Sequence, residues 1–198
     1  MPIAYLYPDS TESNTNWTVD AGNTLHGTLA TTESDSGSPP TPNDDDDIIA
    51  AADGAQFVVT LDDIHLGNLN VNSVDSIQVQ GLHYNVTKGN VSNYTVEIVL
   101  DGTTLYTETS SNVFPNDSYT VWNLVAKTIH PDGSVWTGDD LNGLKLDVIG
   151  NVSAGEMRLN YIRLAVNYTE NLPIYESGEP NMNVEEGIIT VDEGIVIL

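Results

Sequence analysis

The sequence predicts an all-β protein: an antiparallel jelly-roll β-sandwich followed by a C-terminal β arm. Short runs with strand alternation recur along the chain, and turn residues separate them. None of these runs has the 3.6-residue period of a long amphipathic helix. Regularly spaced short strands are typical of sandwiches and barrels. The length of 198 residues suits one such domain with appended segments.

Seven runs in the first two thirds of the chain are predicted as strands. The clearest is 57–61, where Phe57, Val59 and Leu61 alternate with Val58 and Thr60. The dipeptide Asp101-Gly102 joins two of the runs and is the best hairpin signal in the chain. The predicted strands are 3–7, 25–30, 48–51, 57–61, 73–84, 96–100 and 103–109. An eighth is expected at 119–129.

The stretch from Pro131 to Tyr168 carries the most detailed prediction. Thr137 is placed to cap one helical turn through Asp140, and Gly143 is placed to end it. Alternating apolar residues then predict strands at 144–149 and 156–168. The phase of the second strand slips at Tyr161-Ile162, which predicts a β-bulge there.

Changes in composition divide the chain into three parts. Residues 1–168 are assigned to the sandwich, and the Ser-, Pro- and Asp-rich stretch 31–47 is expected to be a mobile acidic surface loop. Residues 169–183 form a polar linker. Residues 184–198 contain a repeat of period seven, in which Gly and β-branched residues favour short strands over helix.

The C-terminal segment 184–198 is interpreted in two ways. As an intersubunit arm, it adds a strand to a neighbouring chain and buries its apolar residues there. As a strand of its own domain, it folds back onto the sandwich. The candidate interface residues are Ile188, Ile189, Val191, Ile195, Val196 and Ile197.

Composition excludes several classes of partner. The formal net charge is −24, with only five Lys and Arg residues, so the chain repels nucleic-acid phosphates and anionic membranes. The acidic balance fits a marine or hypersaline source. Cysteine is absent, and the first residues lack a signal-peptide pattern. We therefore expect synthesis in a host cytoplasm, with no disulfides and no membrane insertion.

The sequence shows no catalytic motif, so we predict that the protein is not an enzyme. The four histidines lack metal-ligand spacing, and Glu97 stands alone on its strand. Solvated loop charge is the preferred interpretation of the acidic clusters, with calcium binding as the alternative. The candidate calcium ligands are Asp46, Asp47, Asp139 and Asp140.

The three tryptophans, Trp17, Trp122 and Trp136, also have two interpretations. Together with several tyrosines they are placed to stack on sugar rings at one face of the sandwich, or they fill its core. A single tryptophan within a strand is more often a core residue. Trp136 is expected to close one end of the sandwich.

The stretch Pro131-Asp132-Gly133-Ser134, then Trp136-Thr137, Asp140-Leu141-Asn142 and the strand to Val166-Asn167-Tyr168, resembles jelly-roll, concanavalin-like virion proteins of tailed viruses of bacteria or haloarchaea. The resemblance spans about residues 1–168 and carries no catalytic residues. It implies a virion component: a capsid decoration protein, or a tail or fibre protein. Within that class we expect a capsid decoration or cement protein that docks on other virion subunits, because the chain is small, lacks a long fibrous repeat and has an arm able to pair with neighbours. We also expect a homo-oligomer. The alternative is a carbohydrate-binding, receptor-binding module of a tail or fibre, with a surface glycan as partner.

Overall fold

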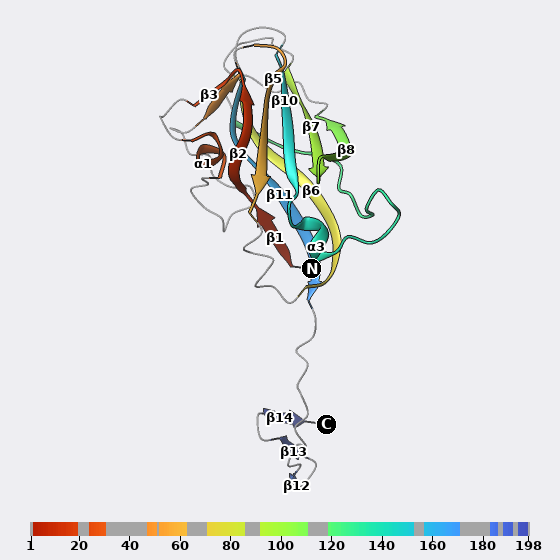
Figure 1. Ribbon diagram of the computed structural model, residues 1–198. Helices are drawn as coiled ribbons and strands as arrows, with labels where there is room; N and C mark the ends of the chain where they lie inside the picture. Colours follow the sequence, from red (N-terminus) through yellow and green to blue (C-terminus); the bar gives the residue numbers. More distant parts are fainter. Residues whose placement is uncertain are drawn as a thin grey trace.

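The protein is an antiparallel jelly-roll β-sandwich, seen here in a computed structural model (Figure 1). Two sheets pack face to face, and the order within each sheet interleaves strands from both ends of the chain. The described residues are 2–19, 24–30, 47–50, 52–62, 71–85, 92–110, 119–152 and 157–170, together with the backbone of 183–185, 188–191 and 194–197. Within them, no helix has the length and apolar character needed to cross a membrane.

The first sheet, sheet A, is six-stranded and is built around β11, Met157–Glu170. One side of β11 pairs with β6, and the other side pairs with β4 and β1 in tandem. The edge strands β3 and β9 complete the sheet. The bounds of its other strands are β1 Ile3–Leu6, β3 Trp17–Val19, β4 Ile48–Ala50, β6 Val71–Asn85 and β9 Tyr119–Asn123.

The second sheet, sheet B, has five strands in the order β2-β5-β10-β7-β8. Its central strands alternate buried and partly exposed residues without a break, as the sequence pattern predicts. Asp101 and Gly102 both have positive φ at the β7–β8 turn, which confirms the predicted hairpin. The strands are β2 Pro8–Thr15, β5 Ala55–Leu61, β7 Ser92–Leu100, β8 Thr103–Thr109 and β10 Lys145–Val152.

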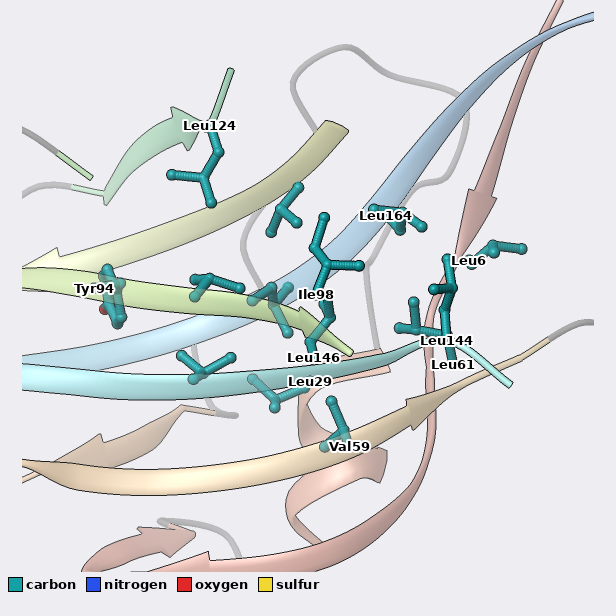
Figure 2. Close-up of a cluster of buried hydrophobic side chains, with 14 of the residues drawn as sticks. Leu6, Leu29, Val59, Leu61, Tyr94, Ile98, Leu124, Leu144, Leu146 and Leu164 are labelled. Carbon is teal, nitrogen blue, oxygen red and sulfur yellow. The ribbon is translucent and has the colours of Figure 1, made fainter. Parts of the chain in front are cut away.

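The core lies between the two sheets, where Figure 2 shows leucines from both layers meeting. Leu146 and Val59 come from sheet B, and Leu164 comes from sheet A. All three are fully buried, and each such side chain contributes about 1.5–3 kcal/mol of transfer free energy. The sandwich is therefore held mainly by these alternating strand residues.

The segment predicted as a strand at 25–30 is a helix, α1, Leu25–Ala30. Its buried residues Leu25, Thr28 and Leu29 recur at helical spacing, and the Thr24 hydroxyl accepts from the Gly27 amide at its start. Leu29 belongs to the core, so the helix packs its apolar side against the sandwich. The strand prediction was wrong because the run is too short for alternation to be separated from a helical face.

The second helix, α3, Gly138–Leu141, confirms the predicted capped turn. Thr137 accepts a hydrogen bond from the Asp140 amide, and the Asp140 carboxylate accepts one from the Thr137 amide. This reciprocal capping box satisfies two amides that the helix leaves open.

Three further predictions need correction. The strand expected at 119–129 ends at Asn123, and 124–129 is extended chain joined to β6 by an isolated bridge at Lys127. The polar run 8–15, which is not among the predicted strands, forms β2. The pairing of β11 with β6 has three register shifts, and the one nearest the predicted bulge falls between Leu159 and Tyr161, not at Tyr161-Ile162.

The C-terminal strands β12 Asn183–Glu185, β13 Ile188–Val191 and β14 Gly194–Ile197 form a three-stranded antiparallel sheet of their own. Strand β11 extends two residues beyond the predicted domain boundary at 168. The acidic stretch 31–46, most of the predicted linker and the side chains of the arm lie outside the described residues.

Candidate functional site

A group of aromatic and polar side chains lies on the face of sheet A that points away from the core. It consists of Tyr5, Tyr7, Gln80, Tyr161 and Arg163, and we call it the tyrosine–arginine cluster. Such a face usually carries small polar groups in contact with water. Here it carries three phenol rings and a guanidinium in mutual contact.

Strand alternation and register bring this cluster together. In β1, Ala4 and Leu6 point into the core, so Tyr5 points to the opposite face. Tyr5 pairs with Ala165, two residues along β11 from Arg163. Arg163 in turn pairs with Gln80 of β6. The cluster thus joins the start of the chain, its middle and its last long strand.

The Arg163 guanidinium is the centre of the cluster. Its Nε donates to Gln80 Oε1 at 3.0 Å, and its Nη1 donates to the Tyr7 hydroxyl at 3.4 Å. Its Cζ lies 3.7 Å from the centroid of the Tyr5 ring and 5.3 Å from that of Tyr161. These are cation–π distances. Arg163 is only 3% exposed, whereas Tyr5, Tyr7 and Gln80 are partly exposed at the rim.

Tyr161 forms the floor of the cluster with Arg163. Its side chain is fully buried, and its hydroxyl has no hydrogen-bond partner among the described residues. Burial raises the pKa of Tyr161 to about 12, although the nearby Arg163 charge acts in the opposite direction. The phenol is therefore a neutral, unused donor at ordinary pH.

The outward face of sheet B carries a different arrangement, centred on two carboxylates. Asp147 pairs directly with Glu97 across β10 and β7. Both Asp147 oxygens accept from Gln56 Nε2 at 2.8 Å, and Glu97 accepts from Thr104 and Thr107. Burial and the Glu97 charge raise the pKa of Asp147, while the Gln56 bond lowers it. Glu97 is the one acidic residue of β7, as expected, and its acidic neighbour Asp147 lies on the adjacent strand β10.

The structure places the predicted calcium ligands at separate features. Asp47 is buried and accepts from Asn160 Nδ2, with Arg158 Nη1 3.8 Å away. Asp140 is engaged in the α3 capping box, and Asp139 lies exposed beside it. Asp46 lies outside the described residues. Among the residues that the structure describes, no three His, Asp or Glu side chains gather as a metal site. Calcium binding stays a prediction.

All three tryptophans are core residues. Trp17 is 3% exposed, Trp122 stacks on Tyr94 at 5.0 Å, and Trp136 is fully buried. The aromatic side chains at a sheet surface are tyrosines instead. Two features of the sequence could have indicated them. Tyr5 and Tyr7 alternate with buried residues, and Arg163 is a lone cation within an apolar run.

Comparisons with known proteins give structural matches alone: no family model and no curated protein matches the chain. One similar structure is the C-terminal family 6 carbohydrate-binding module of LamC, a marine laminarinase from Zobellia galactanivorans. It is 12% identical with a TM-score of 0.41, over 82% of this chain and 98% of that module. Further modules of families 6 and 35 match at a similar level.

Two other matches come from different kinds of protein. A cyclase from Fischerella sp. TAU is 12% identical with a TM-score of 0.43, over 84% of this chain and 91% of the cyclase. A chain of infectious bursal disease virus, Gt strain, is 13% identical with a TM-score of 0.31, over 86% of this chain and 57% of the viral one. These values limit the likeness to the general sandwich architecture. The viral relationship is not confirmed and stays a prediction.

Proposed function

We propose that the protein is a non-enzymatic glycan-binding module and that the tyrosine–arginine cluster is its binding site. The observation that carries this proposal is the partly exposed pair Tyr5 and Tyr7 beside the polar groups of Gln80 and Arg163. A sugar ring offers an apolar face of C–H groups and a rim of hydroxyls. Aromatic rings pack on the face, and amide and guanidinium groups hydrogen-bond the rim.

The position of the cluster suits this role. Tyr5 and Tyr7 have ring centroids 6.5 Å apart and planes tilted by 49°, so they present two differently oriented surfaces. Tyr5 lies in β1, which pairs with β11 alone among the described strands, and Tyr7 follows at the end of β1.

The test is isothermal titration of the full chain with cellohexaose, laminarihexaose and an oligogalacturonate. We expect at least one of these to bind, and Tyr5→Ala and Tyr7→Ala to weaken it about tenfold each by removing stacking surface. Tyr5→Phe keeps the ring and should retain binding. The matched control is Tyr106→Ala, which removes a partly buried tyrosine from sheet B.

Two results would overturn the proposal. The first is that the full chain binds no glycan, neither these three nor the sulfated glycan tested below. The second is that Tyr106→Ala weakens binding as much as Tyr5→Ala, with both variants still folded by near-UV circular dichroism. The capsid-decoration role depends on arm side chains beyond the described residues, and it stays a prediction.

A further inference from the structure

Arg163 differs from the other described cations of this acidic chain. Lys127 pairs with Glu108, Lys145 with Glu12, and Arg158 lies beside Asp47. Arg163 has no carboxylate partner among the described residues, although the chain has 29 Asp and Glu for its five Lys and Arg. It is also the most deeply buried of these four.

A buried guanidinium without a counterion is unfavourable. Removing such a charge from water is costly, and contacts with aromatic rings and neutral acceptors offset only part of that cost. Gln80 accepts from Arg163 Nε, and Tyr7 accepts from Arg163 Nη1. No described group accepts from the remaining nitrogen, Nη2. The paired N–H donors of the guanidinium, its fork, are therefore only partly hydrogen-bonded, and an incoming anion would accept from the remaining donors.

The Tyr161 hydroxyl is a second, independent sign of a missing acceptor. It is buried, 0% exposed and unpartnered within the described residues. A buried unpaired hydroxyl destabilises the fold, because it has lost its hydrogen bonds to water without replacement. Two neighbouring donors, the guanidinium and this phenol, thus lack an acceptor at the floor of one cluster.

We infer that Arg163 and Tyr161 select an acidic glycan, by binding a carboxylate or sulfate group on a sugar whose ring packs against Tyr5 and Tyr7. This inference rests on the proposed glycan-binding function. The anion would accept from the guanidinium fork and from the phenol, which are the charge-assisted bonds that an anionic oxygen makes best. The net charge of −24 opposes an acidic polymer at long range, but this repulsion is screened beyond about 8 Å in physiological salt.

The experiment compares matched charged and neutral glycans on the full chain at about 0.15 M salt. Oligogalacturonate is compared with its carboxyl-reduced form, and dextran sulfate with dextran. We expect one charged member to bind at least about tenfold more tightly than its neutral partner, as a hydrogen bond to a charged group implies. The two pairs distinguish a carboxylate from a sulfate.

Two variants link the preference to the cluster. Tyr161→Phe removes one unpartnered oxygen, so the protein should be as stable as before or more stable, yet it should lose about tenfold of the preference for the charged glycan. Arg163→Lys keeps the charge but loses the fork, and it should lose at least as much. The readout is the ratio of the charged-glycan affinity to the neutral-glycan affinity, because a general weakening of the binding site lowers both affinities and leaves their ratio unchanged.

Each outcome has a defined meaning. Equal binding of charged and neutral partners would overturn the acidic-glycan inference and leave the proposed function standing. Binding of no glycan at all would overturn both. A preference for the charged glycan that survives Tyr161→Phe and Arg163→Lys in folded proteins would place the anion elsewhere and overturn the assignment to these residues.

Discussion

The Nδ1 atom of His83 lies 2.5 Å from the hydroxyl oxygen of Tyr94, and both side chains are buried between the two sheets. Burial lowers the pKa of His83 to about 3 and raises that of Tyr94 well above its ordinary value. The histidine is therefore neutral in the folded protein across the pH range in which the unfolded chain takes up a proton.

This difference predicts acid sensitivity of the fold. Because the unfolded chain binds a proton at His83 below about pH 6.5 and the folded chain does not, stability is present above that pH and is lost as the pH falls toward about 3. The contribution from His83 has a slope of up to about 1.4 kcal/mol per pH unit. Urea unfolding from pH 7 to pH 5 measures it. His83→Gln should flatten the curve, and an unchanged slope would contradict the assignment.

Gly81 is predicted to be irreplaceable by alanine. A Cβ at this position would overlap the Trp122 indole, which lies in the core against β6. Gly81→Ala should therefore destabilise the protein by about 1–3 kcal/mol through overpacking. Gly138→Ala is the matched control, because an alanine Cβ there would meet nothing within 4 Å. Equal midpoints of urea unfolding for the two variants would refute the prediction.

The α3 capping box should contribute measurably to stability. Thr137→Ala removes the hydroxyl that accepts from the Asp140 amide, and we expect a loss of about 1 kcal/mol. Thr137→Ser keeps the hydroxyl and should remain close to the parent. The measurement is the free energy of unfolding in urea. A loss of equal size in both variants would indicate that the Thr137 methyl group, and not the cap, is what matters.

The pairing of Asp147 with Glu97 predicts coupled titration on sheet B. Glu97→Gln removes a like charge, so the raised pKa of Asp147 should fall toward its ordinary value. Gln56→Leu should move the pKa in the opposite direction, because it removes the hydrogen bond that favours the carboxylate. Carbon-13 NMR of the Asp147 carboxyl carbon measures the pKa in both variants. A pKa that is indifferent to Glu97→Gln would contradict the coupling.

The sequence predicted the central strands well because their alternation reports directly which residues face the core. The pattern at Phe57, Val59 and Leu61 is an example. Strand β2 could not be recognised in the sequence, because residues 8–15 are polar on both faces and two register shifts interrupt the pairing with β5. Helix α1 was missed although Leu25, Thr28 and Leu29 have helical spacing, because six residues are too few to establish a period.

The sequence could indicate the residues of the candidate site one by one, but not that they lie together. Tyr5 and Arg163 meet because β1 pairs with β11, more than a hundred residues later, in one particular register. A shift of one residue would turn Tyr5 into the core. Such registers depend on how the whole sheet packs. The same limit explains why the sequence alone does not reveal that Asp147 stands opposite Glu97.

The central place of β11 in sheet A also affects how the chain is made. Strands β1, β4 and β6 all pair with β11. Sheet A therefore lacks its central strand until Met157–Glu170 has been synthesised. A nascent chain on the ribosome therefore holds its first strand unpaired through about 150 residues of translation, at about 5–20 residues per second. A net charge of −24 makes such chains repel one another, which opposes aggregation of strands that are still unpaired.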